Sequence, residues 1–258
     1  MTGGILEIRA GRAVIRGCPT RDRVEGIFVK PNGFQGWEGI TDRRREQVAR
    51  AVEHGDHDVP VYLGARVLTV DVWIIAKTVD MLRTLSQILT GVGADGGRLK
   101  VTIDHQGQEL HALGRTLVAE AEDQGVRHGR YLRSSGQLQF VFADPRKYGD
   151  VKTAPETGTA TSALAFQYGN FPAHPVIEIP NAPAAWSVTS PGGTLQVSGA
   201  PAGGTHRFDM RTGRLTRNGV DVTDTATVTG AIWAVPVGAS WAHTLSAPGR
   251  VLTPTTFV

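Results

Sequence analysis

Only one segment of this chain repeats its apolar residues with the period of an amphipathic helix. Its apolar residues fall three or four positions apart, and they are Val79, Leu82, Leu85, Ile88 and Leu89. Thr78 or Asp80 can cap the start of this helix, and Gly91 and Gly93 follow its end. The other apolar stretches are short and separated by turn residues, in a chain with 32 glycines and 14 prolines. This pattern predicts a mainly β protein, in which one helix covers an apolar sheet face.

The first 150 residues contain several segments with strand character. Residues 5–15 predict a hairpin around Ala10-Gly11, because their apolar residues alternate along the chain. The other expected strands are Ile27–Val29, Val67–Ala76, Leu99–Asp104, Glu109–Val118 and Gln137–Ala143. Residues 42–52 have a composition that permits a helix, but their apolar stripe is thin.

A change in charge density indicates two domains. The chain has 27 Lys and Arg and 24 Asp and Glu, of which only six and five lie in residues 151–258. That leaves 21 and 19 for the first 150 residues. The stretch from Lys152 to Ser162 has no large apolar side chain and is rich in Thr, Ala, Pro and Gly. We therefore expect domains over residues 1–150 and 163–258, joined by a linker over 151–162.

The C-terminal domain is expected to be an antiparallel β-sandwich. Asn218-Gly219 is a strong hairpin signal, because both residue types accept a positive φ. About seven short strands separated by Gly, Pro and Asn turns are typical of a sandwich. They are Val176–Ile179, Ala185–Thr189, Thr194–Val197, His206–Met210, Thr227–Val235, Ser240–Leu245 and Arg250–Thr256.

No segment carries a catalytic or cofactor-binding pattern. The only metal-like cluster is His54, Asp56, His57 and Asp58, whose glycine and following proline indicate a polar turn. Phosphate-cradling, dinucleotide-binding and serine-elbow motifs are lacking. We expect no catalytic, cofactor or metal residues.

Two further features suggest chemistry only weakly. The acidic side chains of Glu120, Glu122 and Asp123 fall in a turn-like stretch, where a solvated loop explains them better than a glycosidase pair. The single cysteine, Cys18, rules out an intrachain disulfide and has no neighbouring histidine to activate it.

The five tryptophans have alternative interpretations. Trp73, Trp186, Trp233 and Trp241 fall in expected strands, where core packing is favoured over sugar stacking. Trp37 lies in a glycine-rich loop, so either core packing or the anchoring of a partner protein explains it.

Overall composition excludes several classes of protein. No apolar run is long enough to span a membrane, and charge interrupts the N-terminal residues before a signal sequence can form. The net charge of +3 is spread over the chain. The densest basic run, Arg43 to Arg45, is flanked by Asp42 and Glu46, which favours a solvated or interface surface over a nucleic-acid patch.

Motifs in the expected first domain resemble those of the distal tail proteins of long-tailed phages, especially phages of actinobacteria. The segment Arg50–Gly55 leads to Arg66–Trp73, the expected helix follows, and Leu113-Gly114-Arg115 comes next. The most distinctive motif is Ala143–Gly149, where a strand runs into an Asp-Pro turn.

The second domain is similar to the galectin-like sandwich of the same family. Residues 169–179 resemble its opening strand, residues 208–222 its central hairpin, and Trp233–Gly238 the turn before its last strands. Such a fold does not by itself imply sugar binding.

This resemblance implies a structural protein of the virion tail tip that is assembled in the host cytoplasm. The first domain would resemble a tail-tube subunit, a β-sandwich or barrel flanked by a helix. Six copies of it would form a ring between the tail tube and the tail-associated hub protein. The tape-measure protein and then DNA would pass through the lumen without specific binding. The galectin-like domains would carry receptor-binding or other tail-tip proteins.

Three other readings remain open at this level. A carbohydrate-binding module for host adsorption would need an exposed tryptophan on the sandwich. A tail-associated hydrolase would need a metal or paired carboxylates, for which His54, Asp56 and His57 are the weak candidates. A prophage remnant or gene-transfer particle would use the same structural protein in another setting.

Overall fold

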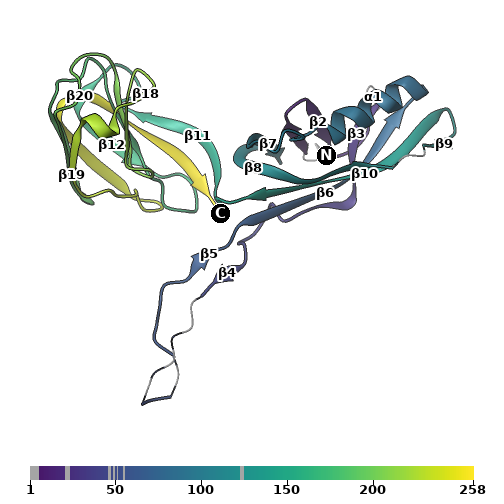
Figure 1. Cartoon of the computed structure of the whole chain (residues 1–258), viewed down its shortest axis with the longest axis horizontal. Helices are drawn as coiled ribbons and strands as arrows, with labels where there is room; N and C mark the ends of the chain where they lie inside the picture. The colour runs from purple at the N-terminus through teal and green to yellow at the C-terminus, as the bar shows by residue number, and fades with distance from the viewer. Residues whose placement is uncertain are drawn as a thin grey trace. The chain divides into compact units, whose positions relative to one another are not determined.

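A computed structural model describes residues 6–20, 24–45, 48, 50, 52–54, 56–122 and 125–258. The chain divides into two compact units, which are Met1–Lys147 with Val258, and Tyr148–Phe257. Figure 1 shows strands in both units and a single α-helix. The prediction of a mainly β protein with one helix is therefore confirmed.

The first unit is built from strands around one helix. Most of the expected strands are present, and several are longer than their sequence patterns indicated. The strands are β1 (Glu7–Ala10), β2 (Ala13–Arg16), β3 (Gly26–Gln35), β4 (Arg43–Arg44), β5 (Tyr62–Leu63), β6 (Arg66–Ala76), β7 (Leu99–His105), β8 (Gln108–Ala121), β9 (Val126–His128) and β10 (Tyr131–Phe142).

Seven of these strands close into a barrel. Each pairs with the next in the order β1, β2, β3, β6, β10, β8 and β7, and β7 returns to β1. All these pairs are antiparallel except β2 with β3. Side chains alternate between the interior and the exterior, so that Leu68, Val70 and Val72 of β6 are buried together with Leu138 and Phe140 of β10.

Helix α1 (Val79–Thr90) packs against β6, β8 and β10, as Figure 1 shows. Thr78 is its N-cap, and its hydroxyl accepts a hydrogen bond from the Met81 amide at 3.2 Å. Leu89 is fully buried, whereas Val79 at the first turn is exposed. The helix therefore contacts the sheet mainly through its C-terminal half.

Gly136 in β10 makes this close contact possible. A Cβ atom added there would lie 2.5 Å from Leu89 Cδ2 and 2.7 Å from the Glu120 carbonyl oxygen. We expect Gly136→Ala to lower the free energy of unfolding by about 2 kcal/mol, because the helix must move outward. Urea unfolding monitored by circular dichroism measures this.

Ser135→Ala is the matched control, since Ser135 is the preceding residue in β10 and faces the opposite side of the sheet. An equal loss of stability in the two variants would contradict close packing at Gly136.

The second unit is a sandwich of two sheets. Its strands are β11 (Lys147–Ala154), β12 (Ala160–Phe166), β13 (Val176–Ile179), β14 (Trp186–Ser190), β15 (Gly193–Ser198), β16 (His206–Asp209), β17 (Arg214–Arg217), β18 (Val220–Asp221), β19 (Thr227–Gly230) and β20 (Ser240–Phe257), with a short 3-10 helix at Thr223–Thr225. One sheet has the order β12, β20, β14, β15, β19. The other has the order β20, β13, β16, β17, β18.

Strand β20 belongs to both sheets. Its residues 240–249 pair with β12 and β14, and Arg250–Leu252 pair with β13. We expected two separate strands here, but the chain continues through Gly249 without a turn. A Cβ atom at Gly249 would lie 2.6 Å from the Glu178 carbonyl oxygen, so the absence of a side chain permits the close approach of the two strands.

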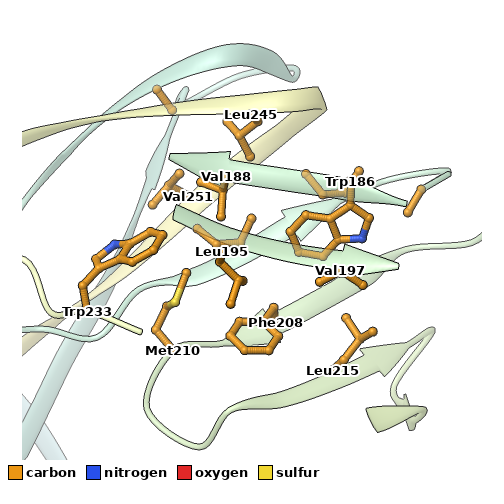
Figure 2. Close-up of a cluster of buried hydrophobic side chains, with 14 of the residues drawn as sticks. Trp186, Val188, Leu195, Val197, Phe208, Met210, Leu215, Trp233, Leu245 and Val251 are labelled. Carbon is orange, nitrogen blue, oxygen red and sulfur yellow. The ribbon is translucent and has the colours of Figure 1, made fainter. Parts of the chain in front are cut away.

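The core lies between the two sheets, as Figure 2 shows. Val188 and Leu195 from one sheet meet Phe208 and Leu215 from the other. Asn218 and Gly219 both have positive φ in the turn between β17 and β18, as the sequence predicted.

The expected linker over residues 151–162 is not a linker. These residues form the end of β11, a turn and the beginning of β12, all within the second unit. Thr, Ser and Ala suit exposed strands well, so the lack of large apolar residues did not indicate an irregular segment.

Candidate functional site: buried cations, an arm and a polar sheet face

Two cationic side chains are buried in the first unit, near the place where the chain leaves the barrel. Arg66, the first residue of β6, is 1% exposed, and Lys147, which follows β10, is 3% exposed. Charged residues are rarely buried this completely unless specific partners compensate them.

Arg66 uses its guanidinium group to hold two segments of backbone. Nε donates to the Pro145 carbonyl at 2.9 Å, and Nη1 donates to the carbonyls of Gly36 and Trp37 at 3.0 and 2.7 Å. Nη2 donates to the Gly39 carbonyl at 3.1 Å. Burial lowers the pKa of Arg66, and Glu38 opposes that shift.

Lys147 binds the same loop. Its Nζ donates to the Trp37 carbonyl at 3.2 Å and lies 5.5 Å from the centre of the Trp37 ring. The carboxylate oxygen Oε2 of Glu38 lies 3.9 Å from Nζ, on a side chain that is 63% exposed. Burial lowers the pKa of Lys147. Both cations therefore fix backbone geometry, because their donors are directed at carbonyl groups of the loop.

The loop that they hold is the root of an arm, which we define as the described residues among 36–65, between β3 and β6. Strands β4 and β5 pair within it, and Figure 1 shows it projecting from the barrel. Several apolar side chains of the arm are exposed, and they are Ile40, Val48, Val52, Val61 and Tyr62. If another molecule covered these side chains with apolar groups of its own, their apolar surface would be removed from water.

We expect Arg66→Met to lower the free energy of unfolding by about 3 kcal/mol, because buried carbonyl groups would lose their donor. Urea unfolding followed by tryptophan fluorescence measures the change. Arg12→Met is the control, since Arg12 is exposed in the β1–β2 turn. Equal stability of Arg66→Met and the parent chain would show that the hydrogen bonds to Arg66 are dispensable.

The barrel also has a polar sheet face, which we define as the side of β6 and β10 opposite α1. Gln137 Nε2 donates to Asp71 Oδ1 at 2.7 Å, and Gln139 Nε2 donates to Thr69 Oγ1 at 3.2 Å. Trp73 is the next residue of β6 on this face after Asp71. The guanidinium carbon of Arg133, from β10, lies 4.8 Å from the centre of the Trp73 ring. Its position in a strand had led us to expect Trp73 in the core. The structure instead places it, half-buried, on this polar face.

Part of the polar sheet face is a shallow depression of about 420 Å³. It is lined by charged side chains of both signs, among them Lys30, Asp71, Glu120 and Glu122. Asp123, the third acid of this predicted cluster, lies outside the described residues. Within the described ranges no group of three His, Cys, Asp or Glu side chains is arranged to hold a metal ion.

The His54 to Asp58 segment forms no recognisable metal centre. Asp56 Oδ2 lies 3.7 Å from Nη2 of Arg45, which makes it part of an ion pair of the arm. Cys18 is exposed after β2. Where the chain is described, no helix is both long and apolar enough to cross a membrane.

The tryptophans of the second unit are structural. Trp186 and Trp233 are 3% and 5% exposed, which confirms core packing, and Trp241 is half-buried. Trp37, for which two interpretations were open, is 1% exposed and packs against Phe142 in the first unit.

Two buried histidines, which sequence reasoning did not find, accept hydrogen bonds from these tryptophans. Trp186 Nε1 donates to His206 Nδ1 at 3.2 Å, and Trp233 Nε1 donates to His243 Nε2 at 3.1 Å. The other ring nitrogens face the carbonyl oxygens of Pro201 and Trp241. Each ring therefore needs one acceptor and one donor nitrogen, which only neutral imidazole supplies.

Burial lowers the pKa of His243, so acid should destabilise the second unit. The unfolded chain takes up the proton first, near the ordinary histidine pKa of about 6.5, so this stability is present above that pH and falls as the pH drops below it. We expect His243→Gln to reduce the pH dependence of the unfolding free energy between about pH 7 and about pH 5. Urea titrations at several pH values measure this.

His128→Gln provides the control, because His128 is exposed in β9. If it flattened the pH profile as much as His243→Gln, the buried Trp233–His243 pair would not be the cause.

Comparison with known proteins found similar structures but no match by sequence. No family model matches the chain, and no curated protein matches it. The crystal structure of SPP1 Dit (gp 19.1), described as a paradigm of the hub adsorption apparatus in phages that infect Gram-positive bacteria, aligns with a TM-score of 0.63 at 17% identity. The alignment covers 88% of this chain and 95% of SPP1 Dit.

Two structures of the phage p2 baseplate in its activated conformation, with Ca and with Sr, align with TM-scores of 0.49 and 0.47. Both have 6% identity, and the alignments cover 100% and 97% of this chain and 99% and 98% of those chains. The alignment with SPP1 Dit has a TM-score of 0.63 and covers 88% of this chain, so the two proteins share a fold over most of this chain.

Proposed function

We propose that this chain is a structural, non-enzymatic distal tail protein of a long-tailed phage. Six copies form a ring that joins the tail tube to the tail-tip hub, and the tape-measure protein and DNA pass through its lumen. The second unit is a galectin-like domain that carries other tail-tip proteins. The observation that carries the proposal is the fold shared with SPP1 Dit across 88% of the chain.

The first unit has surfaces suited to a ring. A cyclic assembly needs two different complementary surfaces on each subunit. The arm, with its exposed Ile40, Val61 and Tyr62, is the surface that we assign to contact with a neighbouring copy. Its root is fixed by Arg66 and Lys147, so the arm starts from a defined position.

The polar sheet face is the surface that we assign to the lumen. Its polar groups bond to one another, as in the Asp71–Gln137 pair, and acids such as Glu120 lie near Lys30. A face with mixed charge lets DNA slide, whereas a basic stripe would retain it by counterion release.

The alternative of a carbohydrate-binding module has less support. This module was expected to present an exposed tryptophan, but Trp186 and Trp233 are buried with their indole nitrogens bonded to histidines. Glycan binding by the purified chain would restore this alternative.

The mass of the purified protein in solution tests the proposal. Six copies of 27.6 kDa give about 166 kDa, and electron microscopy of the same sample should show a ring with β6 and β10 along its channel. Since some rings close only on their partners, a monomer is then tested for incorporation into tails. A monomer that does not enter tails would refute the proposal.

A further inference from the structure

Strand β12 lies at the edge of its sheet and lacks the usual protection of an edge strand. Among the described strands it is paired only with β20. Its sequence, Ala-Thr-Ser-Ala-Leu-Ala-Phe, contains no charged residue and no proline, and Leu164 is 61% exposed. Edge strands of this kind readily pair with another chain, and proteins normally block them with lysine, proline or a covering segment.

A groove runs along this edge within the second unit. It has a volume of about 540 Å³ and lies between residues 151–156 of β11 and the following turn, and residues 162–168 of β12 and the segment after it. Three large apolar side chains that line it are exposed, namely Val151, Leu164 and Tyr168. Phe166 and Tyr168 form an edge-to-face pair with ring centres 4.5 Å apart.

Thr253 of β20 also lines the groove and supplies an independent observation. The residue is 2% exposed, and its Oγ1 has no hydrogen-bond partner among the described groups. Buried hydroxyl groups are nearly always bonded, so an unbonded one beside a groove indicates a missing polar partner. A peptide backbone in the groove has both donors and acceptors to offer.

We propose that the groove binds an extended segment of another protein of the particle, which adds to β12 as a further strand. The segment is uncharged and carries apolar side chains at every second position, which contact Leu164, Tyr168 and Val151. Lys152 and Glu156 balance each other at the groove, so it favours neither an acidic nor a basic segment. The free edge of β12 offers about three amide and three carbonyl groups, half of those on the strand.

The inference rests on the proposed function in one respect, which is the choice of occupant. Two copies of this chain pairing through β12 would form an isologous two-fold contact. A head-to-tail ring of six copies leaves β12 available for a different protein. A sugar would use the aromatic rings but not the free backbone groups of the strand edge.

Photo-crosslinking in assembled tails tests the proposal. A benzoylphenylalanine is introduced at Leu164, and in a second sample at Val220, which is 67% exposed in the edge strand β18 of the other sheet. We expect Leu164 to give an adduct with a different tail protein, within a segment of alternating apolar residues, and Val220 to give none with that segment.

The outcomes separate the two proposals. Tails that contain the chain but give no Leu164 adduct, or only an adduct with a second copy of it, overturn the groove alone. Tails that lack the chain overturn the proposed function and, with it, the groove proposal.

Leu164→Lys provides a second test, because lysine is a natural blocker of edge strands. We expect an unchanged melting temperature, since the side chain is exposed, and at least about tenfold less of the crosslinked protein in tails that retain this chain. An unchanged amount of that protein would overturn the proposal, as would glycan binding by the parent chain that the substitution abolishes.

Discussion

The buried guanidinium of Arg66 determines how the first unit is put together. It lies at the start of β6 and bonds to the backbone that follows each of its two neighbouring strands, at residues 36–39 after β3 and at Pro145 after β10. These are the places where the chain leaves the barrel for the arm and where it leaves for the second unit. Arginine suits this task because its planar group carries five donors in a fixed arrangement and keeps its charge when buried.

Lys147 binds the same loop, since its Nζ donates to the Trp37 carbonyl that also accepts from Arg66. Two cations close to each other repel, and the repulsion contributes to the lowered pKa of Lys147. The Trp37 ring and carbonyl offset part of this cost. The result is a fixed root for the arm, and the contact that we propose for the arm would therefore start from a rigid support.

The sequence allowed much of the fold to be predicted, because the patterns were local. The Thr78 cap, the period of α1 and the Asn218-Gly219 turn each depend on a few neighbouring residues, and all three are present. Local patterns could not predict how the barrel closes, since the pairing of β1 with β7 joins residues more than ninety positions apart. Only the resemblance to tail-tube subunits had implied a β-sandwich or barrel. The linker over 151–162 was predicted wrongly, because exposed strands need few large apolar side chains.

The site was less predictable than the fold. The Arg66–Trp73 and Ala143–Gly149 motifs contain both buried cations, but nothing local distinguishes Arg66 or Lys147 from their exposed neighbours. The Trp186–His206 pair likewise depends on a contact between the two sheets, made by residues 20 positions apart in the sequence. Loop position left core packing and a partner role both open for Trp37, and the structure buries its ring against Phe142 and near Lys147.

Strand β20 gives the second unit a mechanical property. Because one covalent chain is hydrogen-bonded into both sheets, a force applied to either sheet passes through Gly249 into the other. The sheets cannot slide apart without rupturing the ladders of β20, so the unit should resist shear as a single block. If a bound protein pulled on this unit, the unit would pass the force to the rest of the chain without the two sheets separating.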